Sequence, residues 1–130
     1  MKDSSYNLYE KLKIPNFLIF PGSETKLLKG LELGCSGIIS AICNVTAPLS
    51  RKVYDDFHNN KKQTFNERLC AIRKIFDKNN LISGLYSFMS TEDEKYKIVL
   101  PPLSLLSKEQ EKKMINELKN LDFYPERKAA

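Results

Sequence analysis

Two short apolar segments about twenty residues apart constrain the fold of this chain more than any other feature. Residues 17–20 read Phe-Leu-Ile-Phe, and residues 37–41 read Gly-Ile-Ile-Ser-Ala. Continuous apolar runs of this kind are typical of parallel strands that are buried on both faces. The spacing leaves room for a crossover helix between the two segments, and such crossovers are right-handed. The pattern therefore predicts an α/β fold built on a parallel sheet.

The residues that join these two segments predict a turn and then a helix. Residues 21–24 are Pro-Gly-Ser-Glu, in which Ser23 suits a helix N-cap and Glu24 suits the positive end of a helix dipole. Leucines at helical spacing continue to about Leu33. Gly34 then fits the position that follows a helix C-terminus.

Related elements are expected on both sides of this unit. Residues 1–2 read as the end of a strand, and a short helix is expected over about residues 6–13. After the second apolar segment, residues 43–47 are expected to form a loop. Pro48 then suits the first position of a helix that runs to about His58.

The strand pattern stops after His58, and the rest of the chain reads as helical. Ser107 begins a Ser-Lys-Glu-Gln sequence with the spacing of a capping box. The expected elements are helices over about 63–78, 81–89 and 108–121, a polar loop at 90–97 and an extended apolar segment at 98–103. The sequence thus predicts strand–helix units over residues 1–58 and a helical region over residues 59–130 that packs on them.

Charge and cysteine content exclude several classes of protein. The net charge is +5, but there is no basic run interleaved with aromatic residues, so nucleic-acid binding is not expected. The three cysteines form no C-x-x-C pair and His58 is the lone histidine, which argues against a zinc site and a disulfide framework. No apolar run approaches the ~20 residues that span a bilayer, and the N-terminus lacks a signal-peptide pattern. We expect a cytoplasmic protein in a reducing compartment, without membrane contact.

Three motifs lie where a predicted strand ends and a helix begins. They are Met-Lys-Asp-Ser-Ser at 1–5, Pro-Gly-Ser-Glu at 21–24 and Leu-Gly-Cys-Ser-Gly-Ile-Ile-Ser at 33–40, and Leu-Pro-Pro-Leu follows at 100–103. Their order and spacing resemble the second half of the (β/α)8-barrel aldolases and synthases of the dihydrodipicolinate synthase / N-acetylneuraminate lyase family. The resemblance covers almost the whole chain. One departure is Tyr6, which stands where the family usually has glycine.

This resemblance implies a fold and an extent. The chain would be a partial (β/α)8 TIM barrel, about the last three βα units, followed by a C-terminal helical appendage. Residues 1–58 would run from the end of strand six to helix eight, and residues 59–130 would form the appendage. A complete barrel needs about 250 residues, whereas this chain has 130. We therefore expect a fragment that is inactive alone and that needs the missing N-terminal half or an oligomer, since open sheet edges invite association.

The resemblance also implies the chemistry of a carbon–carbon lyase or aldolase. Lys2 would be catalytic, forming a Schiff base with pyruvate or a related α-keto acid, and an aldehyde would be the second substrate. Gly22 would leave room for the substrate, Ser23 and Glu24 would face its distal end, and the backbone carbonyl of Ile39 would lie beside the keto acid. The Ser-Glu pair after Gly22 points toward the aldolases rather than the lysine-pathway synthases. No metal or organic cofactor is implied.

Taken without the resemblance, the same residues have ordinary explanations. Lys2 would be a solvated charge, Gly22 a turn residue with positive φ, and Ile39 a core side chain. Two functions of another class also stay open. The chain could be a non-catalytic half-barrel and helical module that associates with a partner chain, or residues 59–121 could be a helical interaction domain.

Overall fold

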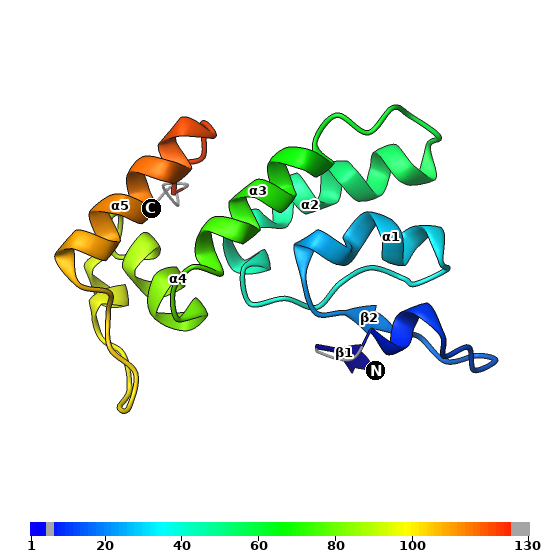
Figure 1. Cartoon of the computed structure of the whole chain (residues 1–130), viewed down its shortest axis with the longest axis horizontal. Helices are drawn as coiled ribbons and strands as arrows, with labels where there is room; N and C mark the ends of the chain where they lie inside the picture. The colour runs from blue at the N-terminus through cyan, green and yellow to red at the C-terminus, as the bar shows by residue number, and fades with distance from the viewer. Residues whose placement is uncertain (5–6, 126–130) are drawn as a thin grey trace. The chain divides into compact units, whose positions relative to one another are not determined.

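The computed structural model describes residues 1–4 and 7–125, which divide into two compact units (Figure 1). The first unit comprises residues 1–70 and the second begins at Ala71. Ser5, Tyr6 and the chain end from 126 onward, on which the first motif and the first expected helix partly fall, lie outside the described residues. The expected division at residue 58 stays a prediction.

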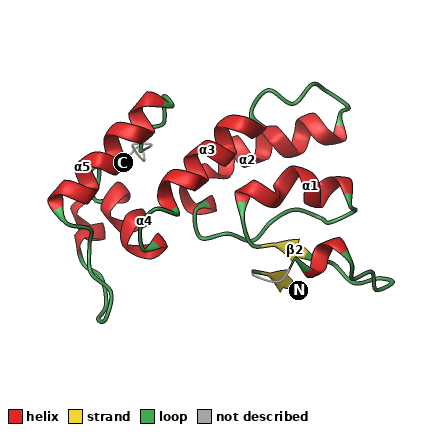
Figure 2. Ribbon diagram, viewed as in Figure 1, coloured by secondary structure: helices red, strands yellow, loops and turns green. Residues whose placement is uncertain are grey.

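Helices make up most of both units, and the described strands lie in the first unit only (Figure 2). The first unit contains β1 (Lys2–Asp3), a 3-10 helix (Leu8–Glu10), β2 (Phe20–Pro21), a second 3-10 helix (Glu24–Lys26), α1 (Leu27–Glu32) and α2 (Cys43–His58). Helix α3 (Asn66–Phe76) follows, then α4 (Leu81–Met89), a 3-10 helix (Glu94–Lys97) and α5 (Lys108–Asn120).

Strands β1 and β2 pair in parallel, as the sequence predicts for this fold class. Lys2 is aligned with Phe20 and Asp3 with Pro21. The ladder continues past the strand ends, because the Gly22 N–H donates to the Asp3 carbonyl at 2.7 Å. The strand expected at 17–20 is much shorter, since a turn reaches Phe17, whose N–H donates to the carbonyl of Ile14.

The third predicted strand, at residues 37–41, is not formed within the described part of the chain, where the sheet has two strands. One ladder-like hydrogen bond survives, from the Ile39 N–H to the Pro21 carbonyl at 3.1 Å. Gly37 has a φ of 146°, outside the range of a strand residue. The prediction of a regular strand here was wrong.

Helix α2 begins at Cys43, so the loop expected over 43–47 was also wrong. Pro48 lies inside the helix rather than at its first position. Its missing N–H leaves only the carbonyl of Asn44 without its helical donor. The first turn is held instead by bonds to the Ile42 carbonyl from the N–H of Val45 and from both the N–H and the hydroxyl of Thr46.

Helix α1 ends as predicted, with Gly34 in a left-handed conformation at φ 88°. The Gly34 N–H donates to Leu31 and the Cys35 N–H to Gly30, which is the Schellman arrangement. Leu27 and Leu31 on this helix are buried, and α1 packs against α2. This packing forms the core that supports the sheet end in the first unit.

Helices α4 and α5 form the core of the second unit, and α5 begins at the predicted cap, whereas the cap of α4 was not predicted. The Asn80 side chain accepts from the Ser83 N–H at 3.1 Å, and Ser107 and Gln110 form the expected capping box. Phe76 and Phe88 are buried and meet edge to face, with ring centroids 5.6 Å apart. Such aromatic pairs add about 0.5–1.5 kcal/mol beyond area burial.

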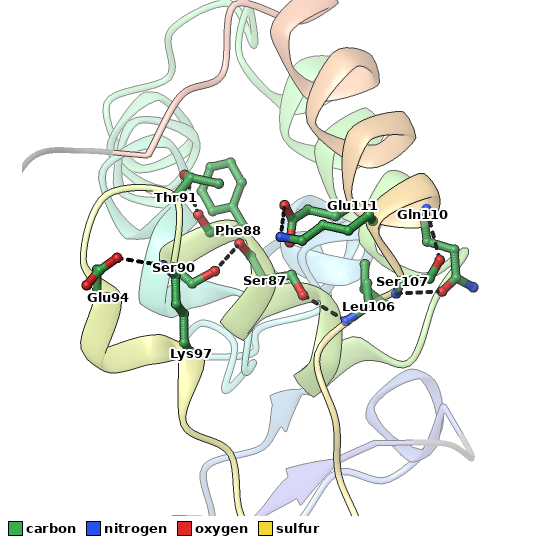
Figure 3. A network of polar contacts seen from close by, with 11 residues as sticks. Ser87, Phe88, Ser90, Thr91, Glu94, Lys97, Leu106, Ser107, Gln110 and Glu111 are labelled. Carbon is green, nitrogen blue, oxygen red and sulfur yellow. Dashed lines mark hydrogen bonds and ion pairs between the residues drawn. The ribbon is translucent and has the colours of Figure 1, made fainter.

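The segment between α4 and α5 is anchored at both of its ends (Figure 3). Near α5, the Leu106 N–H donates to the buried Ser87 hydroxyl at 2.9 Å. Near α4, the Thr91 hydroxyl donates to the Phe88 carbonyl at 2.8 Å. Between these anchors the expected apolar segment is exposed, with Ile98 at 78% and Leu100 at 80%.

Candidate functional site

The C-terminal ends of β1 and β2 bring Lys2 and Gly22 together. Lys2 is the first residue of β1, and its side chain is exposed. A β-carbon built on Gly22 would lie 3.3 Å from Lys2 Cε. The lysine stem therefore lies over the bare backbone of the glycine that follows β2.

Gly22 is required for space rather than for a positive φ. The positive-φ glycines in the described chain are Gly34 and Gly37. At Gly22, a β-carbon would lie 3.0 Å from Ser4 Cα and 3.1 Å from the Asp3 carbonyl oxygen, closer than ordinary van der Waals contact. Gly22 does lie in the expected turn between β2 and the 3-10 helix, but the expected positive φ was wrong, and the close approach of the neighbouring backbone disfavours a side chain there.

The backbone of Ile39 also lies at the end of β2, next to the residue that precedes Gly22. Its N–H donates to the Pro21 carbonyl, one residue before Gly22. Its side chain is 48% exposed, so the expectation of a core side chain was wrong. The structure thus brings the backbones of Ile39 and Gly22 to the end of β2, while the role expected for the Ile39 carbonyl stays a prediction.

Ser23 serves as the N-cap of the 3-10 helix that follows Gly22. Its hydroxyl accepts from the Thr25 N–H at 3.3 Å and lies 2.9 Å from the Thr25 hydroxyl. The predicted capping is confirmed. Contact with a substrate stays a prediction for this residue.

Asp3 is a buried carboxylate beside the candidate lysine. It is 3% exposed and its Oδ2 accepts from the Tyr9 N–H at 3.0 Å, which connects β1 to the 3-10 helix over Leu8–Glu10. Tyr9 is buried as well, and burial, reinforced by the nearby Glu10 carboxylate, raises its pKa above the ordinary value. The acid of the first motif therefore holds the backbone that follows Lys2.

Glu24 is a buried carboxylate whose contacts the sequence did not reveal. It is 0% exposed. Oε2 accepts from the Ser40 hydroxyl at 2.8 Å, and Oε1 accepts from the Thr46 hydroxyl at 3.2 Å and the Cys43 thiol at 3.4 Å. Burial, the Glu24 charge and this hydrogen bond together raise the pKa of the Cys43 thiol to about 11. The expectation that Glu24 faces the distal end of a substrate stays untested by any bound ligand, but its side chain is turned inward.

The parallel pair, the lysine over a bare glycine and the order of the helices after them agree with one family. A family model described as the dihydrodipicolinate synthetase family matches residues 1–121. The chain belongs to this family. A comparison with curated proteins finds no match.

Solved structures show the same fold. N-acetylneuraminate lyase from Fusobacterium nucleatum, complexed with pyruvate, is 19% identical with a TM-score of 0.78 over 92% of this chain and 43% of that one. Dihydrodipicolinate synthase from Agrobacterium tumefaciens is 23% identical with a TM-score of 0.75 over 92% and 42%. YagE, a prophage protein of the dihydrodipicolinic acid synthase family from E. coli K12 in complex with pyruvate, is 20% identical with a TM-score of 0.74 over 84% and 38%. The chain spans about two-fifths of the length of these proteins.

Metal-ligand clusters and membrane-spanning helices are both absent from the residues that the structure describes. Among residues 1–4 and 7–125, no cluster of three or more His, Cys, Asp or Glu side chains could hold a metal ion. No helix in the same part of the chain is both long and apolar enough to cross a membrane. His58 is exposed at the end of α2, as expected, and Asp55 pairs with Arg51 rather than with its neighbour Asp56.

Proposed function

We propose that this chain is part of a carbon–carbon lyase in which the Lys2 amine forms a Schiff base with an α-keto acid such as pyruvate. The observation that carries this proposal is the position of Lys2 in the two-residue strand β1, with its Cε over the bare backbone of Gly22, which follows β2. Ligands of parallel α/β folds collect at the C-terminal ends of strands. Family membership supports the lyase class, and the relatives solved with pyruvate support the keto acid.

The reaction follows from ordinary amine chemistry. The neutral Lys2 amine attacks the ketone carbon to give a carbinolamine, which takes up a proton from solvent and loses water to give a protonated imine. The adjacent carbon then loses a proton to give an enamine, which attacks the aldehyde carbon while the aldehyde oxygen gains a proton; hydrolysis of the imine releases the product, and cleavage is the reverse sequence. Gly22 leaves room for the keto acid, the Ile39 carbonyl lies beside it, and Ser23 is nearest the aldehyde end.

The amine needs an environment that this chain alone does not provide. An amine is kept neutral by removal of water or by neighbouring positive charge, and the Lys2 side chain is exposed. We propose that the remaining strands of a TIM barrel cover it. These strands would come from further sequence or from an associated chain, in a cytoplasmic setting.

Borohydride trapping tests the proposal. The chain, alone and mixed with an N-terminal half of a related enzyme, is incubated with pyruvate and sodium borohydride, and its peptides are mapped by mass spectrometry. We expect reduced pyruvate on Lys2 in the mixed sample and none in Lys2→Arg, while exposed lysines such as Lys11 stay unmodified. Absence of an adduct from both folded samples, or equal labelling of Lys2 and Lys11, would overturn it.

A second candidate is a non-catalytic module that associates with a partner chain. The observation that favours it is the apolar surface beside the short sheet, where Leu18 is 60% and Met1 42% exposed. Such a surface, next to unpaired strand edges, promotes association. A stable assembly that never forms the Lys2 adduct would support this candidate over the enzyme.

A further inference from the structure

The Glu24 carboxylate lies at the junction of two segments that are far apart in the sequence. On one side, Glu24 follows β2 and begins the second 3-10 helix. On the other side, Ser40, Cys43 and Thr46 donate to it, and these residues lead into α2 or lie in its first turn. The carboxylate therefore connects the end of β2 to the start of α2.

Because Glu24 is buried, its carboxylate depends on these hydrogen bonds. A carboxylate removed from water is costly unless hydrogen bonds replace its hydration. Here the side chain is fully buried, and Ser40 and Thr46 direct hydroxyls at its two different oxygens. The Thr46 hydroxyl has one hydrogen and also lies 3.0 Å from the Ile42 carbonyl, so it serves either the carboxylate or its own helix.

The segment fixed in this way also carries Ile39. Ser40 is the next residue after Ile39, and the Ile39 N–H donates to the Pro21 carbonyl at 3.1 Å. A hydrogen bond from Ser40 to Glu24 and one from Ile39 to Pro21 therefore attach consecutive residues to the same turn. Gly22, the residue nearest the Lys2 stem, lies in that turn.

We propose that Glu24 is a positioning residue: its carboxylate, held by Ser40, Cys43 and Thr46, fixes the backbone of Ile39 beside Gly22 and does not contact the substrate. This inference rests on the proposed keto-acid site for its functional meaning. The Glu24 carboxylate is fully buried among these donors, so it is not available to a substrate. Glu24, the first acid after Gly22, therefore acts as a clamp: it holds the backbone of the site but does not line it.

Amide hydrogen exchange tests the clamp directly. In Glu24→Gln, exchange of the Ile39 amide should accelerate by on the order of tenfold, because one partner of a charge-assisted hydrogen-bond set is lost. Glu32→Gln, which makes the same chemical change at an exposed position on α1, should leave it unaltered. Unchanged Ile39 exchange in Glu24→Gln, or equal acceleration across α5, would overturn the proposal.

A second pair of variants separates the hydrogen bond from side-chain volume. Thr46→Val keeps the shape and removes the hydroxyl, whereas Thr46→Ser keeps the hydroxyl. We expect faster exchange at Ile39 in the valine variant and values close to the unchanged chain in the serine variant. The same behaviour in both variants would refute a role for the hydroxyl.

The rate of adduct formation on Lys2 measures the effect of Glu24 on the chemistry, separately from its effect on Ile39 amide exchange. If the mixed, folded sample forms the Lys2 adduct, Glu24→Gln should form it several-fold more slowly, and Glu32→Gln at the unchanged rate. Faster Ile39 exchange with an unchanged rate of adduct formation would overturn the positioning role. If the unchanged chain forms no adduct, the proposed function fails, while Ile39 exchange still decides whether Glu24 is the clamp.

Discussion

The thiol of Cys43 gives a quantitative test of the buried carboxylate. Burial is the main cause of its raised pKa, and the Glu24 charge is the next, moving the value from 9.0 to about 11. The reactive form of cysteine is the thiolate. A rise of two pKa units lowers the thiolate fraction at pH 8 by about a hundredfold, since each unit is a factor of ten.

The assay is alkylation by iodoacetamide at pH 8, followed residue by residue with mass spectrometry. Cys43 in the folded chain should react about a hundredfold more slowly than Cys43 in the chain unfolded by guanidinium. Because its pKa is raised, the folded-state rate should keep climbing between pH 9 and 11, whereas the unfolded-state rate levels off there. Glu24→Gln removes the charge but keeps the burial, so it should raise the rate without restoring it to that of the unfolded chain.

Two results would refute this reasoning. One is folded Cys43 reacting as fast at pH 8 as the unfolded thiol. The other is a Glu24→Gln variant with unchanged thermal stability and an unchanged rate at Cys43. Cys35 and Cys70 report on unfolding in the same samples, since a loosened variant would expose all three thiols together.

Three further substitutions test other parts of the structure. Gly22→Ala places a β-carbon 3.0 Å from backbone, so it should lower the free energy of unfolding by about 1–3 kcal/mol in denaturant titration and reduce Lys2 trapping; an unaltered midpoint would contradict the contact. Phe76→Ala removes a fully buried ring that meets Phe88, and calorimetry should show a loss of about 3–5 kcal/mol; a loss below about 1 kcal/mol would argue against that packing. Ser107→Ala deletes the cap of α5 and should cost about 1 kcal/mol by circular dichroism melting, whereas Ser104→Ala, at an exposed position, should cost almost nothing.

The helices of the second unit could be predicted because the residues that define them are local. The cap of α4 joins Asn80 to Ser83, and the box of α5 joins Ser107 to Gln110, so each motif is complete within four residues. The start of α2 could not be predicted in this way. Its first turn includes Thr46, whose hydroxyl lies 3.2 Å from the Glu24 carboxylate, 22 residues earlier in the chain, so this contact cannot be read from the local sequence.

In the candidate site too, some features could be predicted from the sequence, and contacts between distant residues could not. That parallel strands place Lys2 and Gly22 at one edge follows from the order of apolar segments, because parallel strands share the direction of their ends. The inward orientation of Glu24 does not follow, since its Ser40 donor lies 16 residues further on in a segment whose apolar pattern predicted a strand. Ile39 is exposed for the same reason, as residues 37–41 have one ladder bond to β2 rather than a full strand pairing.

The crowding around Gly22 bears on how lineages of this family lose activity. The atoms that exclude a β-carbon there include Ser4 Cα and the Asp3 carbonyl oxygen, which belong to the backbone and persist whatever side chain occupies position 2. A descendant whose lysine has mutated would therefore still meet this crowding at position 22. Under the proposed chemistry, loss of the lysine would abolish activity, whereas the backbone contacts at Gly22 would be unchanged.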